Sequence, residues 1–108
     1  MKTFGQVITE ARKKARMTQK EVAEQLHRGD GRKVLPPLLN DLEHDRRYPP
    51  ENAVIEQLAR ILKISSDILY FYAKRLPSDV TQDADDTEVE DAYSAFRKTL
   101  DTGKIGRK

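Results

Sequence analysis

TQKEVAEQL (residues 18–26) and VLPPLLNDLEHDRRYPPENAVIEQLARILKISSDIL (residues 34–69) are the two stretches that decide the fold. Apolar residues recur at helical spacing in both, and no alternating run of β-branched residues appears, so the sequence predicts helices rather than strands. Thr18 with Glu21 three residues later forms a capping box, which predicts a helix start. We expect this helix to end near His27, where a glycine-rich turn begins.

The second stretch predicts three more helices. The first of them opens at Pro36, because proline is favoured at the first helical position, where its missing N–H would have no partner anyway. The next helix covers about residues 51–63. A further helix, capped by Ser65 or Ser66, is expected to continue through Arg75. Its apolar side is predicted to be Ile68, Leu69 and Tyr72.

Two more helices are expected outside these stretches. One covers residues 3–16 and has an apolar stripe consisting of Phe4, Val7, Ile8, Ala11 and Ala15. The other covers about residues 87–100 and follows an acidic linker, residues 79–86. The final GKIGRK is expected to be disordered. The chain is therefore predicted to be all-α, with a five-helix domain in residues 1–78 and an appended amphipathic helix in residues 79–108.

Composition narrows the class of protein. The chain has 108 residues and no cysteine, which excludes disulfides and thiolate metal sites. No apolar run approaches the roughly 20 residues that span a bilayer, and the charged N-terminus does not resemble a signal peptide. We therefore expect a soluble cytoplasmic protein without membrane association. The two histidines lack the spacing of a metal site, and no nucleophile–base set appears, so we expect no enzyme activity and no cofactor.

Charge is unevenly distributed along the chain. Residues 1–78 carry 15 Lys or Arg and 10 Asp or Glu, whereas residues 79–108 carry 5 and 8. The formal charges are therefore +5 and −3. The basic part is where a polyanion would bind, although ordinary surface charge explains a value of +5 equally well.

The quoted motifs, in this order and spacing, resemble the lambda-repressor-like (Cro/repressor, XRE) helix-turn-helix family over roughly residues 4–76. The resemblance rests on TQKEVAEQL, on LNDLE followed by a basic turn, and on LARILKISSDIL. It implies a sequence-specific regulator of transcription, expected to be a repressor, that binds double-stranded DNA as a dimer on a pseudo-palindromic operator. An antitoxin-like or adaptor module, which uses the same fold to bind a protein, is the alternative.

The resemblance makes the third helix the base-reading helix. The residues expected to contact bases are Pro36, Pro37, Leu38, Asn40 and Asp41. Prolines and leucine suit thymine methyl groups, while Asn40 could recognise adenine and Asp41 could accept from cytosine. Asp41 is equally well explained as a solvated helix charge. Glu43 is expected to be structural and to bond backbone N–H groups or a basic neighbour. Because the helix offers few donors, DNA shape is expected to contribute to recognition.

Backbone phosphates are the expected partners of a second group of residues. The group is Gln19, Lys20, Arg28, Arg32, Lys33, Arg46, Arg47 and Tyr48. The turn between the two motif helices departs from the family, because residues 27–35 replace about four residues. Its three cations are interpreted as an additional phosphate clamp, with an ordinary polar insertion as the alternative. Asp45 stands where the family often has glycine.

The last predicted helix presents an apolar stripe that needs a partner. Its residues are Val89, Tyr93, Phe96 and Leu100, a possible dimer or partner face. This stripe is expected to pack on its own domain, on a second copy or on another protein, and the sequence leaves these three choices open.

Overall fold

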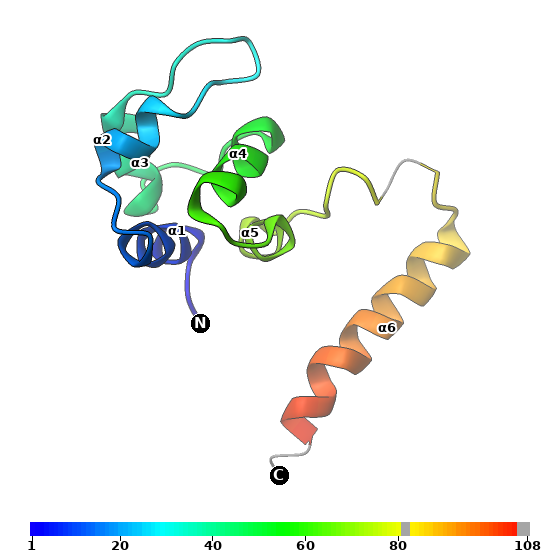
Figure 1. The fold of residues 1–108 in the computed structure, drawn as a ribbon. Helices are drawn as coiled ribbons and strands as arrows, with labels where there is room; N and C mark the ends of the chain where they lie inside the picture. Colours follow the sequence, from blue (N-terminus) through cyan, green and yellow to red (C-terminus); the bar gives the residue numbers. More distant parts are fainter. Residues whose placement is uncertain (81–82, 106–108) are drawn as a thin grey trace. The chain divides into compact units, whose positions relative to one another are not determined.

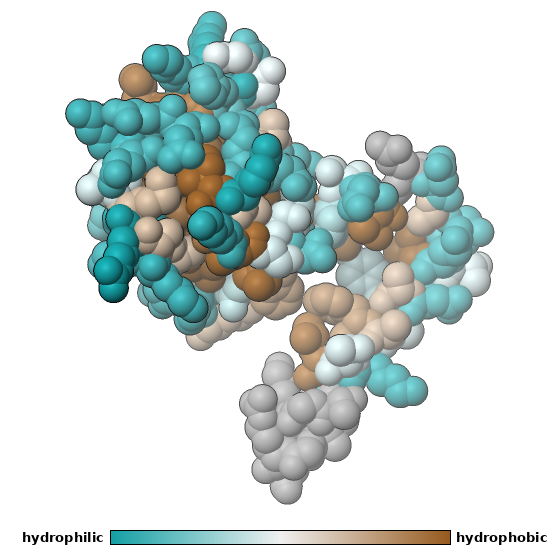
Figure 2. Space-filling view, in the orientation of Figure 1, coloured by the Kyte–Doolittle hydropathy of each residue, from teal (hydrophilic) through white to brown (hydrophobic). Residues whose placement is uncertain are grey.

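The computed structural model describes residues 1–80 and 83–105, with side chains through Asp101. All six elements in the described residues are helices, which confirms the predicted all-α class (Figure 1). The chain divides into two compact units, Met1–Ser78 and Asp79–Lys108. Charged and polar side chains cover most of the face of the first unit shown in Figure 2. Among the described residues, no helix is both long and apolar enough to span a membrane.

Five helices form the first unit, close to the predicted positions. They are α1 (Phe4–Lys14), α2 (Gln19–Glu24), α3 (Pro36–Glu43), α4 (Asn52–Leu62) and α5 (Ser66–Ala73). Capping boxes at Thr3 and Thr18 start α1 and α2, and the Ser65 hydroxyl caps α5. The second helix ends earlier than predicted, at Glu24, because the amides of Gln25 and Leu26 donate to carbonyls three residues back, and a short hairpin follows.

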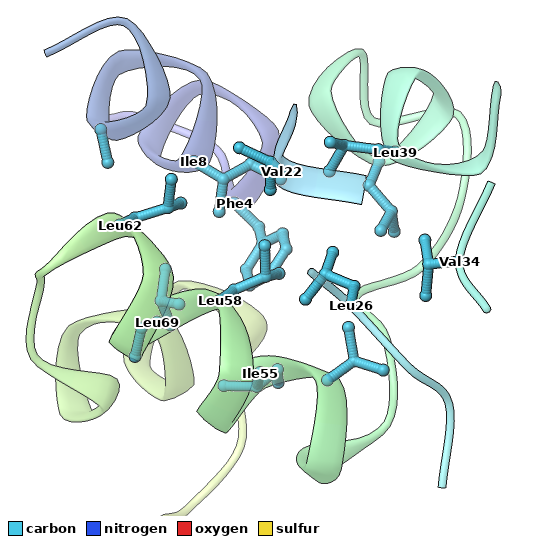
Figure 3. Close-up of a cluster of buried hydrophobic side chains, with 14 of the residues drawn as sticks. Phe4, Ile8, Val22, Leu26, Val34, Leu39, Ile55, Leu58, Leu62 and Leu69 are labelled. Carbon is cyan, nitrogen blue, oxygen red and sulfur yellow. The ribbon is translucent and has the colours of Figure 1, made fainter. Parts of the chain in front are cut away.

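The core of the first unit lies where the five helices converge. Figure 3 shows Phe4, Leu26 and Leu58 pointing into a common centre from three segments of the chain. Val34, the last residue of the hairpin between α2 and α3, is also buried there, so this insertion contributes to the core. Burial of such side chains is the main favourable contribution to folding, about 1.5–3 kcal/mol for each large one.

The structure corrects parts of the predicted apolar faces. Ala15 is exposed, because it is the C-cap of α1 and lies beyond the end of the buried stripe. On α5, Ile68 is 46% exposed, whereas Tyr70 is fully buried. The short α5 is apolar on most sides, so spacing alone did not identify the face that packs. The Tyr70 hydroxyl donates to Glu56 at 2.7 Å, which satisfies its polar group inside the core.

The second unit contains one helix, α6 (Asp86–Ile105), which is longer than predicted at both ends. At its start, the Asp85 side chain accepts from the Glu88 amide at 2.8 Å, and the Glu88 side chain accepts from the Asp85 amide at 3.0 Å. This reciprocal cap places two residues of the expected acidic linker at the helix start. Three residues of the expected disordered tail, 103–105, are helical. The rest of that tail, residues 106–108, lies outside the described residues.

Candidate nucleic-acid interface

The N-terminal end of α3 is apolar and lacks hydrogen-bond donors. Leu35 is the N-cap, makes no side-chain cap hydrogen bond and is 64% exposed. Pro36 and Pro37 have no N–H, and the next amide, that of Leu38, donates to the Leu35 carbonyl. Pro37 is exposed, while Pro36 and Leu38 are half-buried. This end therefore offers van der Waals contact rather than the free N–H groups that usually bind anions at helix N-termini.

Asn40 lies half-buried one turn further along α3, and its amide is held in place. Its Oδ1 accepts a hydrogen bond from Gln19 Nε2 at 3.0 Å. The same Gln19 nitrogen donates to Glu43 Oε1 at 2.9 Å. Both donors of the Gln19 side chain are thus used between helices, and its remaining oxygen is an acceptor that cannot bind a phosphate oxygen. In this structure the Gln19 side chain orients Asn40, and its predicted phosphate contact stays a prediction.

Asp41 is paired with the two arginines that follow α3. Its Oδ1 lies 3.0 Å from Arg46 Nε, and its Oδ2 lies 3.6 Å from Arg47 Nε. The Asp41 side chain is 35% exposed, whereas both arginines are more than half exposed. Asp41 was expected either to accept from cytosine or to be a solvated helix charge, and in this structure its carboxylate has two cationic partners. It partly neutralises the charge of residues expected to bind phosphate.

A groove of about 810 Å³ runs along this side of α3. Its apolar floor includes Leu38, Leu42 and Val54. Its charged rim combines three arginines with three acids, which are Arg28, Arg46, Arg47, Asp30, Asp41 and Glu51. Tyr48, 93% exposed, also lines the groove. Six of the eight predicted phosphate contacts thus divide between this groove and the hairpin beside it.

The extended turn between α2 and α3 is a hairpin (residues 27–34). His27 and Lys33 form an antiparallel bridge, and the Gly31 amide donates to the Arg28 carbonyl at 2.9 Å. Gly31 has a φ of +88°, a conformation that glycine adopts at little cost. Figure 1 shows the hairpin extending away from the helices of the unit. Its three cations are all exposed, and Arg32 lies 3.5 Å from Asp30.

The base of the hairpin is tied to α4. The Gln57 side chain accepts from the His27 amide at 2.9 Å and donates to the His27 carbonyl at 2.7 Å. The Glu51 carboxylate accepts from the Gly29 amide at 2.6 Å. Together with buried Val34, these bonds fix where the hairpin leaves the unit. Sequence reasoning missed this attachment, because it joins residues that lie 22 and 30 positions apart.

The C-terminal end of α3 is held by a buried ion pair with α1. Arg12 Nε donates to Glu43 Oε2 at 2.6 Å and Arg12 Nη2 to Glu43 Oε1 at 3.1 Å. Arg12 Nη1 also donates to the Met17 carbonyl at 2.9 Å. Burial alone would raise the pKa of Glu43, but the bonds from Arg12 and Gln19 outweigh it and lower that pKa. The expected structural role of Glu43 is confirmed, with Arg12 as its basic partner.

Two further contacts position the loop after α3. Asp45 adopts a φ of +57°, and its carboxylate accepts from the Thr3 hydroxyl at 2.5 Å and the Gly5 amide at 2.9 Å. Arg75, just after α5, donates to the carbonyls of Pro49 and Pro50. Arg46, Arg47 and Tyr48 thus lie between two anchored points. The sequence placed Asp45 where the family often has glycine, but nothing in it indicated Arg75.

Comparisons with protein-family models, with curated proteins and with solved structures found no match for this chain. Within residues 1–80 and 83–105, no group of three or more His, Cys, Asp or Glu side chains is arranged to hold a metal ion.

Proposed function

We propose that the first unit binds double-stranded DNA in the manner of the lambda-repressor-like helix-turn-helix family, with α3 in the major groove. The observation that carries the proposal is the Gln19–Asn40 hydrogen bond. It fixes an amide on an eight-residue helix that is flanked by exposed arginines from two loops. A short helix with an oriented amide is suited to hydrogen bonding with base edges in that groove.

Base recognition in this proposal combines one amide with apolar contact. Asn40 Oδ1 retains a second lone pair, and its Nδ2 can donate, so the amide can bond adenine N6 and N7 together. Leu35 and Pro37, exposed at the helix start, suit thymine methyl groups. Leu35 joins the predicted contact residues here, because its exposure at the N-cap was evident only in the structure.

Phosphates are contacted mainly by the hairpin and by the loop after α3 in this proposal. Arg28, Arg32 and Lys33 come from the hairpin, and Arg46 and Arg47 come from the loop. Each neutralised phosphate releases condensed counterions, so binding is expected to weaken steeply with salt. Two such domains on half-sites about 34 Å apart would form the proposed dimeric regulator, acting as a repressor.

Asp41→Asn is expected to strengthen DNA binding. Removing its charge leaves Arg46 and Arg47 free to pair with phosphates, for a gain of about 1 kcal/mol, or roughly fivefold in affinity, at low salt. The change should be similar on every sequence and should make the salt dependence steeper. Asp67→Asn on α5 alters charge equally and should have little effect. Weaker binding by Asp41→Asn than by the wild type would contradict this assignment.

Asn40→Ala is expected to relax recognition at one base pair by about 1–3 kcal/mol, because the oriented amide is lost. Affinities for a set of operators with single base changes measure this effect. Arg47→Ala provides the contrast, since it should weaken binding to all sequences alike and reduce the salt slope by about one. If Asn40→Ala lowers affinity equally at every operator, Asn40 does not recognise a base.

A protein-interaction module is the second candidate function. It is favoured by the exposure of Leu35 and Tyr48, 64% and 93%, near a groove whose charges balance. Apolar and aromatic side chains of this kind are common at the centre of protein interfaces. Titration with duplex DNA separates the two functions, because a protein-binding surface with balanced charge predicts no salt-dependent DNA binding.

A further inference from the structure

One side of α6 carries an exposed apolar stripe. Val89, Tyr93, Phe96 and Leu100 follow each other at spacings of four, three and four residues, and each is 41–49% exposed. Figure 2 shows hydrophobic side chains gathered along this helix, with hydrophilic ones beside them. Alternating spacings of three and four place such residues in one seam that can pack against another helix.

The charges of α6 and its N-cap are separated along its length. The N-terminal half carries only acids, and basic residues begin at Arg97. The acids are Asp85, Asp86, Glu88, Glu90 and Asp91. Glu90 and Arg97 lie seven residues apart, so they occupy the same flank of the stripe. The Arg97 guanidinium carbon lies 5.9 Å from the centre of the Tyr93 ring, which places this charge beside the seam.

We propose that α6 pairs with α6 of a second copy of this chain in antiparallel orientation. Aligning the two seams places Val89 opposite Leu100 of the second copy and Tyr93 opposite its Phe96. In that register Glu90 faces Arg97 of the second copy, and by symmetry Arg97 faces its Glu90. In an antiparallel pair, residues beside the seam on one helix face residues on the same flank of the other helix. The apolar seam and the two ion pairs therefore require the same register.

A parallel pair of these helices is disfavoured by the same charges. It would bring the two acidic halves together and place Asp85 near Glu90 of the second copy. Like charges across a seam oppose association. The antiparallel arrangement also sets the positive N-terminal end of each helix dipole beside the negative C-terminal end of the other. Charge complementarity thus favours a second copy as the occupant of the stripe and fixes its direction.

This inference deepens the dimer of the proposed function, but it is tested without DNA. Failure of self-association would leave DNA binding by the first unit untouched, and failure of DNA binding would leave self-association untouched. The seam has only four positions on each helix, so the dimer is expected to be weak and to need high protein concentration.

Sedimentation equilibrium of the full chain, up to millimolar concentration, tests the pairing. The wild type should dimerise, whereas Glu90→Arg and Arg97→Glu should each weaken association about tenfold or more, because like charges then face each other. An equimolar mixture of the two variants should recover a heterodimer at least as strong as the wild-type dimer, since both cross-pairs are again opposite in sign. Circular dichroism checks that α6 remains helical in each variant.

Lys98→Glu is the matched control. It makes the same charge change one residue further along, on the side of α6 opposite the stripe, and should leave association nearly unchanged. A wild-type chain that stays monomeric throughout would overturn the proposal. A mixture that associates no better than either single variant would overturn the antiparallel register.

Discussion

Arg12→Ala should lower the free energy of unfolding by about 3–5 kcal/mol, because it leaves the buried Glu43 carboxylate without its cationic partner. The Glu43 side chain is 3% exposed and that of Arg12 is 14% exposed, so water cannot replace the lost bonds fully. The Met17 carbonyl also loses its guanidinium donor. Denaturant unfolding monitored by circular dichroism measures the change.

Lys13→Ala is the matched control for this variant. It removes the same charge from the neighbouring, exposed position of α1 and should change stability by about 0.5 kcal/mol or less. Replacing both partners, as in Arg12→Met with Glu43→Leu, should restore much of the loss, since no buried charge then remains. If Arg12→Ala costs no more than Lys13→Ala, the ion pair does not hold α3 on α1.

The same ion pair predicts part of the acid sensitivity of the fold. In the folded chain, the pKa of Glu43 is lowered below its ordinary value of 4.5. The stabilisation that the ionised Glu43 side chain gives to the fold is therefore fully present above pH 4.5. It is then lost as the pH falls through the folded pKa. The stability difference between wild type and Glu43→Gln should therefore shrink on acidification below about pH 4.5.

Gly5→Ala is expected to destabilise the fold by about 3 kcal/mol, although alanine is the better helix former by up to about 1 kcal/mol. A Cβ on Gly5 would lie 2.4 Å from the Glu43 carbonyl oxygen and 2.6 Å from that of Leu42. Both are backbone atoms at the end of α3, so α1 would have to move away from it. That movement would also strain the hydrogen bond from the Gly5 amide to Asp45.

Gly29→Ala is the control for this substitution. The nearest atom to its Cβ would be a side-chain oxygen of Glu51, at 3.0 Å, rather than a backbone atom, so a cost below about 1 kcal/mol is expected. Thermal unfolding of the two variants beside the wild type compares the effects. An unchanged or higher melting temperature for Gly5→Ala would show that α1 and α3 are not packed as closely as described.

Helices were predictable here because local signals determine them. The capping box at Thr18 and the proline at residue 36 marked two helix starts to the residue, and apolar spacing located α4 within one residue at each end. The end of α2 was placed too late, because the hairpin is stabilised by Gln57 and Glu51 of a distant segment. Such partners are not visible in local sequence patterns.

The candidate interface was only partly predictable for a related reason. Charge and exposure of the loop arginines follow from residue type, but the partners of Gln19 and Asp41 depend on how α2, α3 and the following loop pack. Packing gives Gln19, which was expected to contact phosphate, a hydrogen bond to Asn40, and its phosphate contact stays a prediction. Packing also turned Asp41 into a partner of Arg46 and Arg47 rather than a free acceptor.

Selection of bound sequences from random duplex DNA by the full chain, followed by titration of the enriched duplex across salt, tests DNA binding most directly. The proposed function predicts an enriched pseudo-palindrome whose half-sites are one helical turn apart, and an affinity that falls linearly with the logarithm of salt concentration. Absence of binding to any duplex at low salt would contradict it. Binding with a steep salt dependence but no enriched sequence would contradict base recognition through Asn40.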